Sequence, residues 1–518
     1  MVIYARFFDG FWLGDDFGNL DRAWLADRAG TLWSDGLAQF LAGVGSDGAF
    51  YRPVMIASLL VNEAIAGPHY AGWFAFNLIV HAANTVLVGA LAMRLAAASG
   101  GDGRLSGFVA ALFFALSPLL AEGVFWISAR ADACVTLLTL AGVYAWGTAR
   151  SAPGQAMALP LLLLPALGFK ESAAVLPLQM MLVALAWPVR LTRAQIGAIV
   201  ACFVLVAAFF AMRAHLFGDA WQVYRTADAA PLPERARSAL LSIVPWWVAL
   251  TRGTPLAADI EVALAMLAAV LLAAAAAGAR ARVALALVAA SAGLVAATLL
   301  NLGSLSDNGE GGRLAYSPIA WLALALGVAG ARPWPVGAPR ERRRLRVAGV
   351  ALAALSVITG AFVLETVVAH AYAVERMLRT LTASLPQWAA THPGLTLLLV
   401  PDRVGAVVAA RNAQAGLVLP PVQPRALLDR VLPTVPREIA ARHDQLAAGL
   451  AARLAIMQSA GIDAPMPAQR PAAPRWPAHY ACASPDGGIV RLPAPDPQSR
   501  ETWIADLRQA WSRCEAAR

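Results

Sequence analysis

Charged residues are scarce in this sequence. They make up 14% of the 518 residues, whereas an average soluble protein carries about 25%. Lysine occurs once, at Lys170, and every other basic residue is arginine. The hydrophobic share is 59% and the mean hydropathy is +0.60. This deficit of charge excludes an ordinary soluble protein over most of the chain and indicates a membrane protein.

Cysteine is also rare. Of the four cysteines, Cys134 and Cys202 fall inside apolar segments, where a thiol usually packs as a small hydrophobic group. Cys482 and Cys514 lie in the more polar C-terminal part and could form a disulfide in an oxidising compartment. No CxxC motif and no His–Cys cluster indicates a metal site.

The spacing of residues along the chain also excludes a tetratricopeptide repeat protein and a nucleic-acid-binding protein. No repeat of roughly 30–50 residues is visible, so tetratricopeptide arrays are absent. The net charge of +9 would suit nucleic-acid binding, but the arginines of the apolar part lie in short loops rather than along one face. We therefore expect no nucleic-acid partner.

Long apolar runs dominate residues 55–365. Each is close to the length of about 20 residues that crosses the hydrocarbon of a bilayer. Ten spans are expected, at 70–93, 106–127, 132–149, 157–169, 172–189, 195–213, 261–279, 283–302, 314–331 and 347–365. Residues 1–13 resemble the end of a further span that begins upstream, or an interfacial aromatic anchor. Residues 18–54 have the pattern of amphipathic helices on the membrane surface.

The last 150 residues, roughly, have ordinary polarity and predict a small α/β domain. Helices are expected at Tyr372–Leu385 and 500–516, strands at 395–400, 404–410 and 416–419, and Pro-rich loops at 420–436 and 464–478. The expected fold is therefore an all-α polytopic membrane domain over residues 1–368, with about 10–11 transmembrane helices, followed by a soluble C-terminal domain over residues 369–518.

The distribution of charge in the loops predicts the orientation. Arginines fall in alternate loops: Arg94/Arg104, Arg150, Arg190/Arg193, Arg280/Arg282 and the cluster at 332–346. These loops are cytoplasmic by the positive-inside rule. The other loops are then outside, with Asp15, Asp16, Glu122, Asp132, Glu171, Asp219, Asp228, Asp307 and Glu310. The short apolar segment 238–252 preserves this alternation if it is half-buried on the outer face, and the C-terminal domain is then extracytoplasmic.

Ionisable residues at the rim of a membrane bundle are candidates for function. Asp15 and Asp16 lie among aromatic residues in the first outer loop, and a carboxylate there could accept the proton of an attacking hydroxyl. The second acid could hold the acceptor or a divalent cation. A helix cap or a solvated pair of acids is the structural alternative.

Several cations share this predicted face. Arg130 could clamp a phosphate while Glu122 and Asp132 orient it, or it could simply pair with Asp132. Lys170 suits a lipid-linked phosphate, or it could be an interfacial lysine neutralised by Glu171. The same face also carries Arg52, Arg313 and the hydroxyl of Tyr316.

Asn77, His81 and Asn84 recur on one helix face. This stripe could line the site, but polar residues spaced in this way more often join transmembrane helices. His81 is no metal site by itself, because no second ligand stands at a suitable spacing.

Together these motifs resemble the GT-C superfamily of membrane glycosyltransferases, and most of all the protein O-mannosyltransferase and TMTC-like branch with its bacterial relatives. The matching pieces cover about residues 1–330: Asp15-Asp16-Phe17, Tyr51-Arg52-Pro53, Asn77…His81…Asn84, Ser117-Pro118…Glu122…Arg130-Ala131-Asp132, Lys170-Glu171 and Arg313…Tyr316-Ser317-Pro318. Ser117 stands where the family often has histidine.

The resemblance implies a polyprenyl-phosphate sugar donor, an unknown acceptor and transfer with inversion. It implies a base in the acidic pair, with Asp15 slightly favoured, and donor-phosphate contacts from Arg130, Lys170 and Arg313. A bacterial inner membrane is the expected location. The alternatives are a flippase for lipid-linked glycans, which would place charges at the bilayer midplane, and a catalytically inactive assembly subunit.

Overall fold

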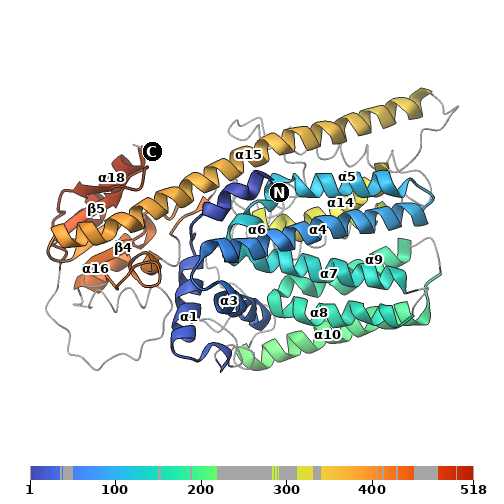
Figure 1. Cartoon of the computed structure of the whole chain (residues 1–518), viewed down its shortest axis with the longest axis horizontal. Helices are drawn as coiled ribbons and strands as arrows, with labels where there is room; N and C mark the ends of the chain where they lie inside the picture. Colours follow the sequence, from blue (N-terminus) through green and yellow to red (C-terminus); the bar gives the residue numbers. More distant parts are fainter. Residues whose placement is uncertain are drawn as a thin grey trace.

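The protein is described by a computed structural model. It covers residues 2–34, 51–149, 153–186, 190–218, 312–330, 340–404, 407–410, 414–427, 430–447, 476–497 and 499–516, with isolated positions near 38 and 283–290. Most of these residues form a bundle of helices that run side by side (Figure 1). The bundle comprises α4 (Tyr70–Ala98), α5 (Gly103–Ala115), α7 (Arg130–Thr148), α8 (Ala158–Phe169), α9 (Leu176–Ala186), α10 (Arg193–Phe217) and α14 (Tyr316–Gly330).

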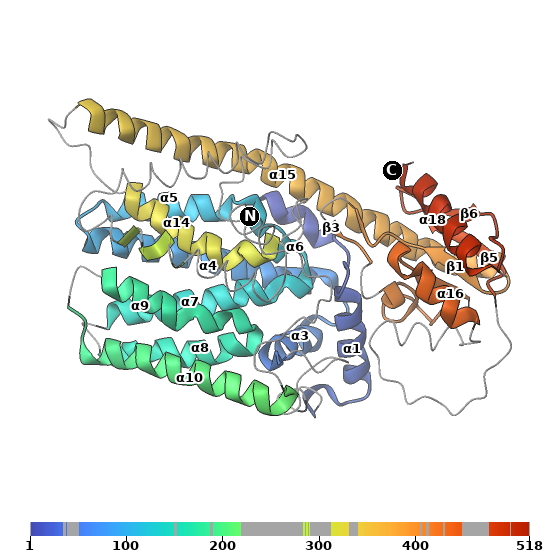
Figure 2. The same cartoon turned by 180° about the vertical axis from the view of Figure 1, so that it is seen from behind.

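Shorter elements lie mainly at the end of the bundle that faces the C-terminal domain (Figures 1 and 2). They are η1 (Val2–Asp9), α1 (Asp16–Arg28), α3 (Pro53–Ala66), η2 (Pro118–Leu120), α6 (Glu122–Phe125), η3 (Ile127–Ala129), η5 (Glu171–Val175) and η7 (Gly312–Ala315). The connection from α4 to α5, the η4 turn (Pro153–Met157) between α7 and α8, and the start of α10 lie at the opposite end.

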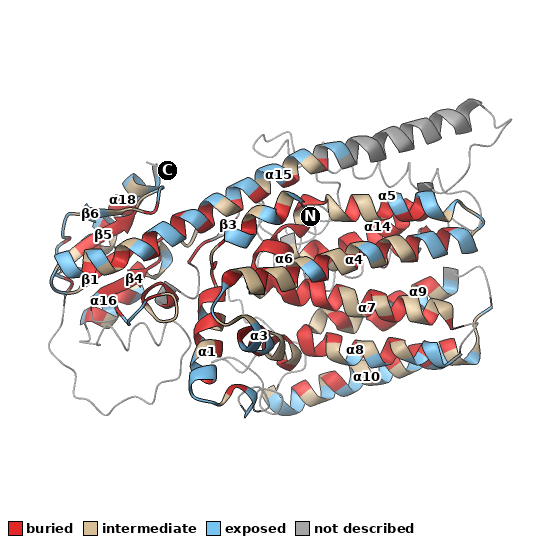
Figure 3. Ribbon diagram, viewed as in Figure 1, coloured by how far each residue is buried: buried red, intermediate tan, exposed pale blue. Residues whose placement is uncertain are grey.

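Three described helices are long and apolar enough to cross a membrane: Tyr70–Ala98, Ile127–Thr148 and Arg193–Phe217. Buried residues fill the interior of the bundle, and its outer face carries large exposed apolar side chains (Figure 3). Ile79 is 67% exposed, Val86 71% and Val204 63%. Side chains of this kind facing outwards are suited to lipid, which confirms an integral membrane protein.

The expected span at 106–127 is not one straight helix. It bends by 53° between α5 and the segment Pro118–Phe125. Pro118 cannot donate a backbone hydrogen bond, and it keeps Ser117 extended, with φ −69° and ψ 117°. The bend turns α6 across the end of the bundle.

The other expected spans have mixed outcomes. Helices α4, α7 and α10 match the expected spans 70–93, 132–149 and 195–213. Helices α8, α9 and α14, expected at 157–169, 172–189 and 314–331, are shorter apolar helices. The expected span 347–365 is part of α15 (Arg340–Thr391), a single helix of 52 residues. The segments 238–252, 261–279 and most of 283–302 lie outside the described residues, as do Asp219, Asp228, Asp307 and Glu310.

Helices α4 and α7 run parallel and in register. Asn77 Nδ2 donates to Val124 O and Trp126 O, both at 3.3 Å. Two turns further along α4, Asn84 Nδ2 donates to Ala133 O of α7 at 2.9 Å. The two asparagines therefore join α4 to α6, to the segment after α6 and to α7, because amides in an apolar setting need partners.

The C-terminal domain is joined to the bundle by α15, and the expected boundary at 368/369 falls within this helix. The domain contains a four-stranded sheet in the order β4-β1-β5-β6. Its strands are β1 (Thr396–Leu399), β4 (Val431–Thr434), β5 (His479–Ala483) and β6 (Ile489–Leu492). β1 pairs in parallel with both β4 and β5, and β5 pairs antiparallel with β6. A separate ribbon pairs β2 (Arg403–Val404) with β3 (Val407–Val408).

Local predictions for this domain were partly correct. The strand at 395–400 and the helix at 500–516, now α18 (Arg500–Ala516), are confirmed. The strand at 416–419 is wrong, since Gln414–Val418 forms the 3-10 helix η8. The loop at 420–436 is wrong in part, because it contains β4. Pro433 is tolerated there because β4 lies at the sheet edge, where a missing donor need not break the ladder. Most of 464–478 lies outside the described residues.

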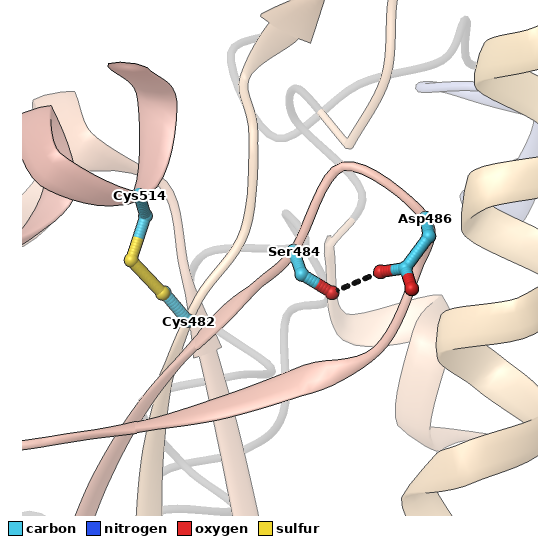
Figure 4. Close-up of a disulfide and its surroundings, with 4 residues drawn as sticks. All are labelled: Cys482, Ser484, Asp486 and Cys514. Carbon is cyan, nitrogen blue, oxygen red and sulfur yellow. Dashed lines mark hydrogen bonds between the residues drawn. A yellow bond between two sulfur atoms is a disulfide. The ribbon is translucent and has the colours of Figure 1, made fainter. Parts of the chain in front are cut away.

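The expected cysteine pair is confirmed: Cys482 on β5 and Cys514 on α18 form a disulfide (Figure 4). Next to it, Ser484 and Asp486 hydrogen-bond to each other in the turn between β5 and β6. Gly487 in this turn has φ +87°, and an added Cβ would lie 2.3 Å from Met377 O of α15. The hairpin therefore packs tightly against α15.

Candidate active site

Residues 10–17, which include Asp15 and Asp16 and are called the acidic loop below, lie where the bundle meets the C-terminal domain. Gly14 has φ +48°, which glycine adopts without strain, and its N–H donates to Ala409 O at 2.7 Å. Asp15 follows at the N-cap of α1, but its side chain makes no capping hydrogen bond. Asp15 is half-buried, whereas Asp16 is 1% exposed. The two carboxylates are adjacent in sequence and lie in different environments.

Asp16 joins the acidic loop to the segment before α7. Its Oδ1 accepts from Ser128 N at 2.7 Å and also from the Ser128 hydroxyl. Its Oδ2 accepts from Leu13 N and Ile127 N, each at 3.3 Å. Burial raises the pKa of Asp16 to about 7, even though the hydrogen bonds from Ser128 act in the opposite direction. Asp16 therefore has the contacts of an anchor for the loop.

The cations and acids expected at the outer face form three ion pairs. Lys170 Nζ lies 2.7 Å from Asp132, Arg52 lies 2.7 Å from Glu171, and Arg313 lies 2.7 Å from Glu122. These side chains are 9–26% exposed. The suggested pairs Arg130–Asp132 and Lys170–Glu171 are therefore wrong, because each acid has a closer cation on another element.

Arg313 lies near the acidic loop. Its guanidinium is 4.5 Å from the centre of the Trp126 ring, and Trp126 Nε1 donates to Leu13 O at 3.0 Å. Among the three paired cations, Arg313 has the most exposed side chain, at 26%. Of these three cations, Arg313 is therefore the one that Trp126 links to the Asp15 loop.

Arg130 is fully buried. Its guanidinium donates to Ile127 O and Ser58 O, each at 3.3 Å, and to the side chain of Asn62. The charge also lies 4.7 Å from the centre of the Phe76 ring. With its donors directed at protein atoms, Arg130 holds α3, α4 and α7 together in this structure.

His81 and Tyr316 are also internal. His81 Nδ1 and Tyr316 Oη are 2.7 Å apart, and both residues are at most 1% exposed. An added Cβ on Gly123 would lie 2.7 Å from the Tyr316 ring, so α6 packs directly on it. These contacts join α4, α6 and α14 behind the ion pairs.

The structure also shows residues that the sequence did not single out. Ser128 lies two residues before the motif Arg130-Ala131-Asp132, and its small hydroxyl gave no separate signal. Tyr70, Glu375 and Arg379 contact the acidic loop or its neighbours from α4 and α15. No sequence motif marks these three residues, because each lies in a helical stretch without a distinctive pattern.

Within the described part of the chain, no group of three His, Cys, Asp or Glu side chains is placed to hold a metal ion. A cavity of about 150 Å³ lies at the other end of the bundle, among Arg94, Tyr144, Trp146 and Trp321. It is remote from Asp15, because α4 and α7 start at the acidic end and carry Arg94 and Tyr144 in their last turns.

No protein-family model matches the chain, and no curated protein sequence matches it. Two solved structures resemble parts of this chain. ArnT from Cupriavidus metallidurans, bound to undecaprenyl phosphate, has 15% identity over 78% of this chain and 81% of that chain, with a TM-score of 0.44. The arabinofuranosyltransferase AftD from Mycobacteria has 16% identity over 78% of this chain and 29% of that chain, with a TM-score of 0.35. Similarity at this level does not assign their activities to this chain.

Proposed function

We propose that the chain is a membrane glycosyltransferase of the GT-C type. It takes a sugar from a polyprenyl-phosphate donor and transfers it with inversion to an acceptor at the extracytoplasmic face. The observation that carries the proposal is the gathering of the Asp15 loop and three cation–carboxylate pairs at one end of the bundle. A flippase would instead place such charges near the bilayer midplane.

Asp15 is the proposed base. It is half-buried, whereas Asp16 is 1% exposed and its carboxylate accepts hydrogen bonds from Leu13, Ile127 and Ser128. A base must reach the hydroxyl of the acceptor. Asp15 accepts that proton as the oxygen attacks the anomeric carbon, and the lipid phosphate leaves with the electrons of the bond to the sugar.

Arg313 and Lys170 are the proposed contacts for the lipid phosphate. Each is held 2.7 Å from a carboxylate, so its charge is already positioned before the donor arrives. A phosphate group accepts charge-assisted hydrogen bonds from arginine and lysine. Arg130 is left out of this set because its donors bind protein atoms.

The orientation of the protein in the membrane follows from the charges at the two ends of the bundle. Arg94 and Arg104 lie at the end opposite to Asp15, which makes that end cytoplasmic by the positive-inside rule. The acidic end and the disulfide-containing C-terminal domain are then extracytoplasmic, in a bacterial inner membrane.

A divalent cation at the acidic pair remains part of the proposal to be tested with a chelator.

The decisive experiment is sugar transfer by the purified protein from a polyprenyl-phosphate sugar, with acceptors chosen from the glycan profile of a deletion strain. We expect Asp15→Asn to lower kcat by about 10²–10⁴-fold while donor binding and accumulation in membranes persist. Asp27→Asn is the matched control, because Asp27 is an exposed acid on the same helix α1.

Two results would overturn the proposal. Wild-type transfer by Asp15→Asn would remove Asp15 from the role of base. A wild-type protein that binds the lipid-linked sugar and never turns it over would instead be an inactive assembly subunit.

A further inference from the structure

A buried glutamate of α15 contacts the acidic loop. Glu375 is 0% exposed. Its Oε2 accepts from Phe11 N at 3.0 Å, and its Oε1 lies 2.9 Å from Tyr70 Oη. Phe11 is four residues before Asp15, and Glu375 is 364 residues from Phe11 in sequence. A helix that leads into the C-terminal domain thus reaches the segment that presents Asp15.

The hydrogen bonds around Glu375 indicate its protonation state. Tyr70 Oη also lies 3.0 Å from Phe125 O, which can only accept. The single tyrosine proton cannot serve both Phe125 O and a carboxylate. If the Glu375 carboxyl carries a proton, it donates to Tyr70, Tyr70 donates to Phe125 O, and every group is satisfied. Burial, the largest cause, raises the pKa of Glu375 well above its ordinary value, in agreement with this arrangement.

A second residue of α15 holds the same segment. Arg379 lies one turn after Glu375 and donates to Gly10 O at 2.6 Å and to Asp9 Oδ1 at 2.8 Å. An added Cβ on Gly10 would lie 2.4 Å from Glu375 Oε2. The loop is therefore in direct contact with α15, and only glycine fits at residue 10.

The C-terminal domain contacts the other side of the loop. Ala409, just after β3, accepts the hydrogen bond from Gly14 N. An added Cβ on Gly416 of η8 would lie 2.4 Å from Phe17 Cβ. Side chains of α15 and the backbone of two C-terminal segments thus contact residues 10–17.

We propose that Glu375 is a positioning residue for the acidic loop, so that α15 and the C-terminal domain form one wall of the site that presents Asp15. Glu375 acts through Phe11 and Tyr70 and does not touch the sugar. This inference rests on the proposed function for its kinetic consequence, whereas its structural consequence can be measured without activity.

The test compares Glu375→Ala with Glu375→Gln in the full-length protein. Glutamine can accept from Phe11 N and donate to Tyr70 Oη, as a protonated glutamate does. Alanine instead removes the acceptor of Phe11 N and leaves Tyr70 Oη with Phe125 O alone. We expect Glu375→Ala to lower kcat by roughly 10–100-fold with little change in KM for the lipid donor, because a small displacement of a base is costly. Glu375→Gln should keep most of the wild-type kcat.

Amide hydrogen exchange provides the measurement that does not depend on activity. Exchange of a peptide covering residues 9–17 should be faster in Glu375→Ala and near wild type in Glu375→Gln. Glu365→Gln is the matched control, because Glu365 is an exposed acid on the same helix that pairs with Arg6, before the loop. If Glu375→Ala fails to accumulate, Arg379→Ala supplies the same two measurements.

The outcomes separate the two proposals. Unchanged exchange and unchanged kcat in Glu375→Ala, or an equal loss of kcat in Glu375→Gln and Glu375→Ala, would overturn the positioning role. Faster exchange in Glu375→Ala in a protein without any transferase activity would support the positioning of the loop and overturn the glycosyltransferase function.

Discussion

At the scale of single residues, burial separates two carboxylates that are neighbours in sequence. The first turn of α1 directs Asp16 towards the backbone of Ile127 and Ser128, while Asp15 stays half-buried. Environment, rather than residue type, therefore separates the two carboxylates, and this difference supports the proposal that Asp16 is an anchor and Asp15 the base. In the sequence the two acids are equivalent except for their order.

Asp16 should make stability depend on pH. Its pKa is about 7 in the folded protein against 3.8 as the ordinary value. Between these values the folded state binds more protons than the unfolded state, so stability falls as pH rises through the window. Thermal unfolding in detergent should show this slope between about pH 4 and 7, and Asp16→Asn should reduce it. An identical slope in the variant would contradict the assignment, with Asp27→Asn as the control.

At the scale of elements, ion pairs join elements whose paired residues are 38, 119 and 191 positions apart in sequence. Lys170, at the end of α8, pairs with Asp132 in the first turn of α7. Arg52, before α3, pairs with Glu171 of η5. Arg313 of η7 pairs with Glu122 of α6. Each pair connects two elements at the acidic end, so the pairs order the site as well as supply charge.

Removing one partner of the Lys170–Asp132 pair should be costly. Lys170→Met leaves a buried carboxylate without its cation, and we expect a loss of about 3–5 kcal/mol in the free energy of unfolding. The double variant Lys170→Met/Asp132→Leu should recover much of this loss, since no charge is then buried alone.

The exposed pair Arg500–Asp444 is the control for this measurement. Its side chains are 50% and 54% exposed, and Arg500→Ala should lower the free energy of unfolding far less than Lys170→Met. Equal losses at the two pairs would show that burial does not set the strength of the Lys170 interaction.

At the scale of the whole molecule, the candidate site and the arginines of the predicted cytoplasmic side lie at opposite ends of the bundle. The acidic loop, the three ion pairs and the C-terminal domain lie towards one end, and the helix ends that carry Arg94, Arg104 and Arg193 lie at the other (Figure 1). Helix α15 extends along the bundle and continues to the C-terminal domain. The predicted extracytoplasmic side therefore contains both the candidate site and the disulfide.

The disulfide offers a test of this orientation. Cys482–Cys514 should be oxidised in membranes from cells, because disulfides persist in oxidising compartments. Thiol alkylation before and after reduction should reveal two additional reactive thiols upon reduction, since the only free cysteines, Cys134 and Cys202, are buried. Reduced Cys482 and Cys514 in native membranes would contradict an extracytoplasmic domain.

A double cysteine variant measures how much the disulfide stabilises the C-terminal domain. Replacing both Cys482 and Cys514 with serine should lower the stability of the C-terminal domain by about 2–5 kcal/mol. Replacing Cys134 with serine serves as the comparison outside that domain.

Local pattern alone predicted much of the architecture. Hydropathy placed α4, α7, α10 and α14, because a helix satisfies its own backbone and needs only an apolar surface to remain in lipid. Apolar and polar spacing predicted α18 at 500–516, and the apolar run at 395–400 predicted β1. Charge in the loops was sufficient to assign the candidate cations and acids to one face.

Contacts between distant residues required the tertiary structure. Sequence neighbours suggested Arg130–Asp132 and Lys170–Glu171, but folding pairs Asp132 with Lys170 and Glu171 with Arg52. Pro433 entered a strand because β4 is at an edge, and Glu375 reached Phe11 across 364 positions. Helix formation and lipid burial depend on residues a few positions apart, so the sequence determines them directly. Ion pairs, strand order and the wall behind Asp15 depend on which surfaces meet, and only the folded chain decides that.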